Sequence, residues 1–167
     1  FPLAPPRELP LSAVDRLVPF VHETVWIYLS DYLLLLIAFL VCRDTLRFAG
    51  AFLTVIAVSV LAQWLVPIAF PRARFPVDPS AGLSAWAVSM LWSIDAPTSC
   101  LPSLHVGMAA MAALAGWRAP PLWAPRATPA LIAAWSAAVC ASTLTVKQHY
   151  AVDVLAGLAV AVLLLVY

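Results

Sequence analysis

The sequence Lys-Gln-His-Tyr-Ala-Val-Asp at residues 147–153 places three ionisable side chains at the start of a long apolar segment. His149 and Asp153 are four residues apart. If a helix begins near Gln148, the two side chains share one helix face, and the carboxylate can hydrogen-bond one imidazole nitrogen. A histidine held in this way is a poised base or nucleophile. We therefore expect the chain to be organised around this histidine.

A second stretch, Cys-Leu-Pro-Ser-Leu-His-Val-Gly at residues 100–107, supplies another histidine, His105. The Pro-Ser pair that precedes it is typical of a helix start, with Ser103 as the N-cap residue. The helix that follows is rich in alanine and glycine, which favours close packing against neighbouring helices. We expect the fold to bring His105 and His149 together.

The composition predicts an integral membrane protein. Of 167 residues, 64% are hydrophobic and only 10% are charged, and the mean hydropathy is +0.97, whereas soluble domains have about 25% charged residues. The net charge of +1 gives no basic field, so nucleic acid is excluded as a partner and membrane lipids are expected instead. Cys42, Cys100 and Cys140 lack the spacing of a disulfide framework or a zinc site, and we predict neither metal nor cofactor.

The apolar segments predict an all-α fold, an integral membrane helical bundle that forms a single domain over residues 1–167. About five transmembrane helices are expected, plus an interfacial amphipathic helix at residues 80–94, where apolar residues recur at helical spacing. Asp31, inside the first span, is expected to snorkel or to hydrogen-bond another helix. The expected spans are residues 24–42, 48–70, 103–117, 129–146 and 150–167.

Counting the crossings gives an expected orientation. If residues 80–94 do not cross the membrane, both histidines lie at the same face as two arginines of the segment 71–76. The opposite face collects Arg43, Arg47, Arg118 and Arg126. The positive-inside rule places that second face in the cytoplasm, and therefore places the histidines on the non-cytoplasmic face.

Two histidines, a carboxylate, several cations, a serine hydroxyl and a helix N-terminus together suit a phosphoryl group. Cations neutralise its oxygens, the helix N-terminus binds anions, and one histidine can attack phosphorus while the other protonates the leaving oxygen. Zinc chemistry suits the set less well, because the arginines and the lysine would repel a divalent cation. A serine hydrolase is disfavoured because the chain has no Gly-x-Ser-x-Gly elbow.

Two motifs resemble those of a known family. Residues 102–105, Pro-Ser-Leu-His, resemble the Pro-Ser-x-His motif of the type-2 phosphatidic acid phosphatase superfamily, which also includes the vanadium haloperoxidases. The stretch from Ser142 through His149 to Asp153 resembles that family's Ser-Arg-x5-His-x3-Asp motif. The resemblance covers the chain from about residue 48 to its end.

The resemblance implies a role for each matched residue. His149 would be the nucleophile that forms a phosphohistidine, and Asp153 its orienting partner. His105 would be the general acid for the leaving group. Ser103 and Ser142 would contact phosphate oxygens.

The sequence departs from the family pattern at two places. Thr143 stands where the family has an arginine, and we expect Lys147 to replace that cation. The family's first motif, a lysine several residues before Arg-Pro, is not reproduced, but residues 71–76 offer Arg72 and Arg74 as phosphate ligands. The Lys-Gln-His-Tyr form of the third motif is similar to the branch that contains inositol phosphorylceramide and sphingomyelin synthases.

By this resemblance, the chain is expected to be a metal-independent lipid phosphatase or phosphotransferase that acts on a lipid phosphate ester through a phosphohistidine. The alternative within the family is a lipid headgroup transferase. The alternative from another class is a non-catalytic lipid-binding or transport bundle, degenerate at Thr143 and at the first motif. The family core has six spans, so one span is expected before Phe1.

Overall fold

The computed structural model describes residues 4–95, 97–123 and 126–165, and almost all of its regular structure is helical. The predicted all-α class is confirmed. Two-residue strands β1 (Arg7–Glu8) and β2 (Ile68–Ala69) pair in parallel. The helices are α1 (Ala13–Leu17), α2 (Val25–Leu29), α3 (Asp31–Val41), α4 (Thr45–Leu65), α5 (Leu83–Ile94), α6 (Leu104–Arg118), α7 (Ala127–Thr145) and α8 (Ala151–Leu165), with 3-10 turns η1 (His22–Thr24), η2 (Arg72–Arg74) and η3 (Pro79–Ala81).

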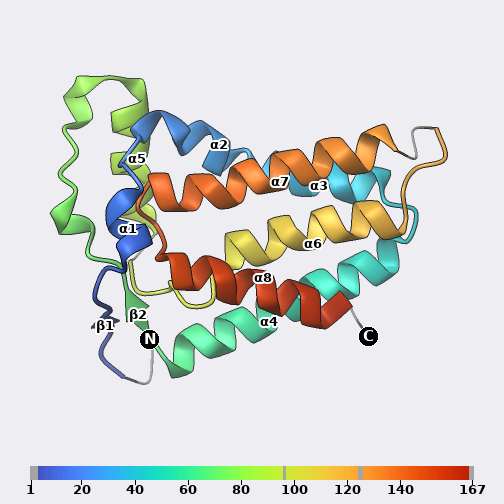
Figure 1. The fold of residues 1–167 in the computed structure, drawn as a ribbon, viewed down its shortest axis with the longest axis horizontal. Coiled ribbons are helices and arrows are strands. Elements are labelled where there is room, and N and C mark those ends of the chain that lie inside the picture. The colour runs from blue at the N-terminus through green and yellow to red at the C-terminus, as the bar shows by residue number, and fades with distance from the viewer. Residues whose placement is uncertain (1–3, 96, 124–125, 166–167) are drawn as a thin grey trace.

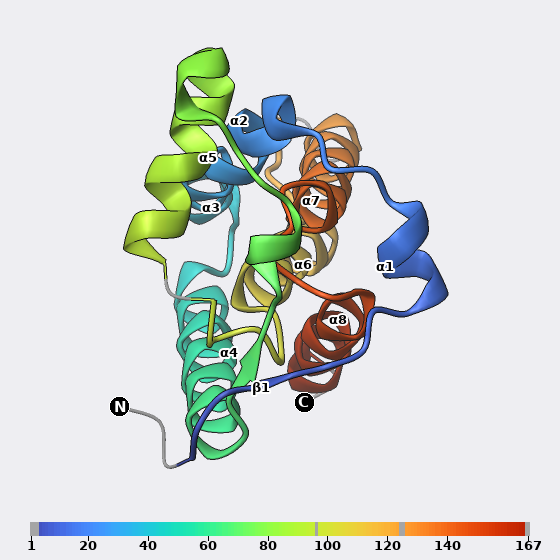
Figure 2. The ribbon, with the colours of Figure 1, turned by 90° about the vertical axis from the view of Figure 1, so that its left-hand side faces the viewer.

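Helix α6 is the centre of the bundle. It packs against α3, α4, α7 and α8, and Figure 2, an end-on view, shows these helices around it. Most of α6 is buried, including an uninterrupted run at residues 106–112. Because four of these seven residues are alanine or glycine, neighbouring backbones can approach closely. The close packing predicted from the composition of this segment is confirmed.

Among the described residues, three helical stretches are long and apolar enough to cross a membrane: His22–Val41, Thr45–Leu65 and Ala127–Thr145. Helices α6 and α8 have 15 residues each, which at about 1.5 Å per residue gives roughly 22 Å, less than the roughly 30 Å of a hydrocarbon core. Three of the five predicted spans thus meet the length requirement. The other two are shorter helices of the same bundle.

The second span ends earlier than predicted. We expected it to run to residue 70, but α4 stops at Leu65. The reason is Pro67, which has no backbone N–H and disfavours helical geometry at Val66 before it. The released chain then pairs Ile68 with Arg7 of β1.

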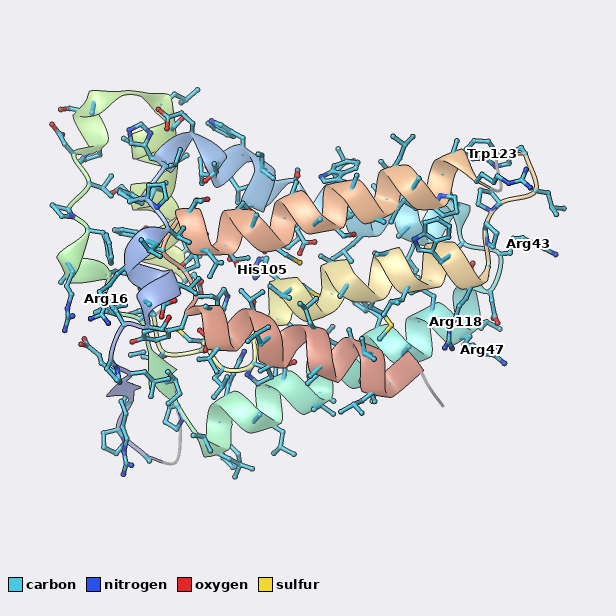
Figure 3. The ribbon with its side chains drawn as sticks, in the orientation of Figure 1. Arg16, Arg43, Arg47, His105, Arg118 and Trp123 are labelled. Carbon is cyan, nitrogen blue, oxygen red and sulfur yellow. The ribbon has the colours of Figure 1, made fainter. Side chains whose placement is uncertain are left out.

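The two ends of the bundle differ in chemistry. Figure 3 shows Arg43, Arg47 and Arg118 at one end, with His105 toward the other end. Helices α1 and α5 and both strands gather around the His105 end (Figure 1). The predicted separation of the histidines from these arginines therefore holds in the fold.

The predicted amphipathic segment forms η3 and α5, and Figures 1 and 2 show α5 running across the end of the bundle. Part of its apolar stripe faces away from the protein core, with Leu83 68% and Ile94 84% exposed. An apolar surface on a helix that crosses the bundle end suits the membrane interface.

The expectation for Asp31 is wrong. Its side chain is 0% exposed, and neither carboxylate oxygen has a hydrogen-bond partner among the described residues. It occupies the first turn of α3, among the buried residues of that helix. The side chain therefore remains inside the bundle and does not snorkel.

Two glycines allow close approaches next to the histidine motifs. A Cβ atom on Gly157 of α8 would lie 2.6 Å from the carbonyl oxygen of Ser103, and one on Gly107 of α6 would lie 2.9 Å from Val55 Cγ1 of α4. At the contact between α6 and α8, the Ser103 N–H donates to the Asp153 carbonyl at 3.1 Å. The start of α6 is thus held directly against the first turns of α8.

We predict that Gly157→Ala destabilises the protein by about 1–3 kcal/mol, because the added methyl group overlaps backbone atoms that cannot move independently. The matched control is Gly50→Ala in α4, where nothing lies within 4 Å of the added Cβ. That change should be neutral or stabilise by roughly 0.5–1 kcal/mol. Thermal unfolding in one detergent compares the variants, and an unchanged Tm for Gly157→Ala would contradict the proposed close contact.

Candidate active site

His149 and Asp153 are paired as predicted, but for a different reason. Helix α8 begins at Ala151, so His149 precedes the helix and shares no helix face with Asp153. The Asp153 carboxylate instead folds back over the helix start, where Oδ2 accepts the Tyr150 N–H at 2.8 Å. The same oxygen lies 3.5 Å from His149 Nδ1. A helix cap therefore orients the carboxylate toward the histidine.

The surroundings of His149 assign its tautomer. Its Nδ1 lies 3.1 Å from the carbonyl oxygen of Cys100 as well as near Asp153. Because both neighbours accept hydrogen bonds, Nδ1 carries the proton and Nε2 keeps the lone pair. The side chain is only 7% exposed. His149 thus presents Nε2 in a fixed, largely water-shielded position.

His105, in the first turn of α6, is the neighbour of His149. Their ring centroids are 6.5 Å apart. His105 Nδ1 lies 3.1 Å from the hydroxyl of Tyr28, on α2, whose ring packs on the imidazole with centroids 4.4 Å apart. His105 Nε2 is buried with no hydrogen-bond partner in the described part of the chain. Tyr28 therefore holds one nitrogen and leaves the other for a ligand.

Ser103 and Ser142, both predicted to contact phosphate oxygens, differ in what their hydroxyl groups bind. Ser103 Oγ accepts the Val106 N–H at 3.4 Å, which confirms Ser103 as the N-cap of α6. The hydroxyl of Ser142 donates to the Val139 carbonyl at 2.7 Å within α7. Thr143, at the family's arginine position, also donates into its own helix, to Cys140 at 2.8 Å. The fold brings Ser103 to the histidines, whereas the hydroxyl protons of Ser142 and Thr143 are used by α7.

Arg72 belongs to the site. It lies in η2, is 9% exposed, and donates to the Asp95 carbonyl and to Gln148 Oε1. Its guanidinium also lies 3.4 Å from the Asp95 carboxylate and over the ring of Trp92. Burial lowers the pKa of Arg72, and the negative charge of Asp95 opposes that shift. The arginine is thereby fixed beside the residue that precedes His149.

Gln148 and Asp95 complete a three-residue cluster with Arg72, which we call the arginine cluster. Gln148 Nε2 donates to Asp95 Oδ2 at 3.3 Å. Neither Gln148 nor Asp95 was predicted as a site residue. The only available signal was a polar side chain next to His149 and an acidic residue at the end of the amphipathic segment, and neither specifies a contact across the fold.

Two of the cations predicted to bind phosphate, Arg74 and Lys147, make their contacts away from the histidine pair. Arg74 is 61% exposed and faces Glu8 at 3.9 Å. The ammonium group of Lys147 donates to the carbonyls of Asp15 at 3.2 Å and Val18 at 2.6 Å. The prediction that Lys147 replaces the missing family arginine is therefore not supported by its position, because the N-terminal segment binds the ammonium group.

Cys100, His149 and Asp153 place ligand atoms within 4.8 Å of one another, a group that could hold a metal ion. Burial raises the pKa of the Cys100 thiol to about 12, and the thiol hydrogen-bonds the Pro97 carbonyl at 3.2 Å. Metal binding would have to remove this thiol proton. The arrangement suits histidine chemistry better, with Asp153 as the partner of His149.

The fold and site together define a helical membrane protein whose two histidines, carboxylate and arginine meet at one end of the bundle. A family model described as the PAP2 superfamily matches residues 8–167, so the chain belongs to this superfamily, that of the type-2 phosphatidic acid phosphatases. A search of the curated proteins found no match. A search of the solved structures found none either.

Family membership confirms the resemblance drawn from the two motifs. It supports phosphatase or phosphotransferase chemistry on phosphate esters. Together with the three long apolar helices, it indicates an integral membrane protein. The roles of the individual site residues stay predictions.

We predict that Arg72→Ala weakens binding of orthovanadate, a phosphate analogue, by roughly tenfold to a hundredfold, the effect of losing a charge-assisted hydrogen bond of about 1.5–3 kcal/mol. The matched control is Arg74→Ala, whose side chain is exposed and should change the affinity by less than about twofold. Isothermal titration calorimetry measures both. Equal effects of the two substitutions would refute the assignment of Arg72 to the site.

Proposed function

We propose that this protein is a metal-independent membrane enzyme that transfers the phosphoryl group of a lipid phosphate ester to His149, and then to water or an alcohol. The observation that carries the proposal is the histidine pair. His149 presents the lone pair of Nε2, and His105, 6.5 Å away between ring centroids, presents an Nε2 without a partner. A nucleophile and a proton donor thus lie close enough for one phosphate ester to contact both.

In the first step, His149 Nε2 attacks phosphorus while the ester P–O bond breaks. The bound anionic phosphate ester favours the protonated form of His105. The leaving oxygen takes a proton from its Nε2, and the products are an alcohol and a phosphohistidine. The positive charge that develops on the imidazole of His149 is stabilised by Asp153 through Nδ1, the arrangement found in histidine–carboxylate pairs generally.

In the second step, water or an alcohol attacks the phosphohistidine. His105, now neutral, accepts the proton of the attacking oxygen while the P–N bond breaks and His149 recovers its lone pair. The products are inorganic phosphate from water, or a new phosphate ester from an alcohol. Both histidines end the cycle in their starting protonation states.

Arg72 and the start of α6 are the proposed ligands of the phosphate oxygens. A guanidinium has five N–H donors, and the contacts to Asp95 and Gln148 involve only its two terminal nitrogens. The Nε–H of Arg72 is buried without a partner in the described residues. Ser103 caps the N-terminus of α6, which attracts anions through its dipole.

An apolar groove beside the site supports a lipid substrate. The groove has a volume of about 300 Å³ and lies between α5 and the α2–α3 helices. Its wall residue Tyr32 places its ring edge-on to His105, 6.2 Å between centroids. The lining residues are Trp26, Leu29, Tyr32, Trp86, Ala87, Met90, Leu91 and Ile94. Apolar and aromatic side chains of this kind suit an acyl chain whose phosphate lies at the histidines.

The charge distribution supports a non-cytoplasmic active site. The end of the bundle opposite the histidines carries Arg43, Arg47 and Arg118 (Figure 3), and the polar turn between α3 and α4 contributes one acidic residue there, Asp44. The histidine end carries cations as well, Arg16 among them (Figure 3), but Arg72 and Lys147 are buried there in contacts within the protein. The positive-inside rule therefore favours the opposite end for the cytoplasm.

The small exposure of His149 favours a lipid alcohol as the acceptor, which makes a headgroup transferase of the inositol phosphorylceramide synthase type the second candidate. A site with little water access would protect the phosphohistidine from hydrolysis. The groove next to His105 offers an apolar route by which a lipid alcohol could reach it.

We predict that His149→Ala abolishes turnover, and that His105→Ala and Asp153→Asn each lower kcat by at least about a hundredfold. The purified protein is incubated in EDTA with a phosphate-labelled lipid, with and without a lipid alcohol. Free labelled phosphate indicates a phosphatase, and label in the acceptor indicates a transferase. Turnover by a folded His149→Ala variant would refute the mechanism, and no transfer by the unmodified protein would favour the non-catalytic lipid-binding bundle.

We also predict that Met90→Glu in the groove raises KM for a long-chain lipid phosphate about tenfold, since burying an apolar side chain of this size contributes about 1.5–3 kcal/mol. Turnover of a water-soluble aryl phosphate should be unchanged. Leu83→Glu is the matched control, because Leu83 is exposed on the same helix but is not among the groove residues. If both substitutions affect the lipid equally, the acyl chain does not bind in the groove.

A further inference from the structure

The segment before the first long helix runs along the loop that carries His149. We call residues 9–24 the N-terminal strap and residues 145–151 the catalytic loop. The two run in opposite directions, and Figure 2 places α1 beside α7 and α8. The contacts are Val21 N–H to the Thr145 carbonyl (3.0 Å), Thr24 Oγ1 to Thr145 Oγ1 (2.7 Å), Lys147 Nζ to the carbonyls of Val18 (2.6 Å) and Asp15 (3.2 Å), the Tyr150 hydroxyl to the Leu9 backbone (3.0 Å), and Ala151 N–H to Asp15 Oδ1 (2.7 Å).

Asp15 is the central residue of these contacts. It is buried, and its Oδ2 accepts the Ser12 N–H at 2.8 Å in a capping box at the start of α1. Its Oδ1 accepts the N–H of Ala151, the first residue of α8. One carboxylate therefore caps two helices. Because Asp153 accepts the neighbouring Tyr150 N–H, two carboxylates, one from each end of the chain, fix the helix start that follows His149.

The charge of Asp15 is retained in this position. Burial raises its pKa, but the hydrogen bonds from Ser12 and Ala151 and the nearby charge of Lys147 outweigh burial, and the resulting pKa is lower than usual. A negative charge at the N-terminus of α8 is also favoured by the helix dipole.

Lys147 fixes the other side of His149. Its backbone has φ +55°, in the left-handed region that residues with a side chain rarely adopt. The ammonium group is buried against two strap carbonyls and lies 4.8 Å from the ring centroid of Phe75. The strap contacts thus hold a residue whose backbone conformation is unfavourable, two residues before His149.

We propose that Asp15 and Lys147 are positioning residues for His149, and that the N-terminal strap is part of the catalytic machinery. This inference rests on the proposed role of His149 as the nucleophile. Neither residue touches the substrate. Together they fix the backbone on both sides of His149, and thereby the direction in which Nε2 faces phosphorus. A displacement of about 1 Å at a reacting atom can lower a rate by about a hundredfold.

The test compares Asp15→Ala with Asp15→Asn in the full chain. The alanine removes the acceptor for the Ala151 N–H, and kcat for a lipid phosphate should fall by roughly tenfold to a hundredfold while KM changes by less than about twofold. The asparagine keeps one amide oxygen that can accept the Ala151 N–H, but its NH2 group cannot accept the Ser12 N–H. Asp15→Asn should therefore restore part of the turnover. Rates are compared per folded protein, so a loss of activity that came only from instability would leave kcat unchanged.

The matched control is Asp44→Ala. Asp44 caps α4 by accepting the Arg47 N–H at 3.3 Å, at the end of the bundle opposite the histidines. This variant loses a helix cap of the same kind and should keep the kcat of the unmodified protein. If Asp15→Ala and Asp44→Ala have the same kcat, the proposal is overturned.

Lys147→Arg and Lys147→Met provide a second pair in case Asp15→Ala does not fold. The arginine keeps N–H donors for the strap carbonyls and should retain more than half of the turnover, whereas the methionine should lose it to the same extent as Asp15→Ala. Equal turnover of the two Lys147 variants would overturn the proposal.

Orthovanadate binding separates this inference from the proposed function, because it requires no turnover. If the unmodified protein binds vanadate but transfers no phosphoryl group, the proposed function fails while the positioning role can still be measured. Asp15→Ala should then bind vanadate about tenfold more weakly than Asp44→Ala, as expected for a displaced site residue. Equal affinities would overturn the positioning role.

Discussion

The structure depends on the carboxylate of Asp153 and the backbone beside it. The side chain caps the start of α8 and lies next to His149, while the carbonyl of the same residue accepts the N–H of Ser103 at the start of α6. One residue therefore joins the two helix starts that carry the histidines. Since Ser103 and Asp153 are both fully buried, their polar groups depend on these contacts, which constrain both motifs at once.

Local patterns in the sequence predicted much of this arrangement. The all-α class, the central Ala-rich helix and the cap at Ser103 follow from composition and from neighbouring residues. The pairing of His149 with Asp153 was predicted from their spacing, although the helix begins after His149. The family resemblance, confirmed over residues 8–167, depended on the same short motifs. Features that depend on residues close together in the sequence could therefore be predicted from it.

Contacts between residues far apart in the sequence could not be predicted from such local patterns. Lys147 lies two residues before His149 in the sequence, and its charge alone predicted a phosphate ligand. Its ammonium group instead binds carbonyls 129 and 132 residues away. Tyr28 contacts His105 across 77 residues, and a tyrosine in an apolar segment has no sequence pattern that distinguishes this role. By contrast, the early end of α4 could have been predicted from Pro67.

The contact between Asp15 and Ala151 joins residues 136 positions apart, which has a consequence for biosynthesis. Translation runs from the N-terminal side, so the strap is made well before α8, and the Asp15 carboxylate must wait for the amide that it caps. The backbone around His149 therefore acquires this part of its fixed geometry only after the helices between the strap and α8 have been made.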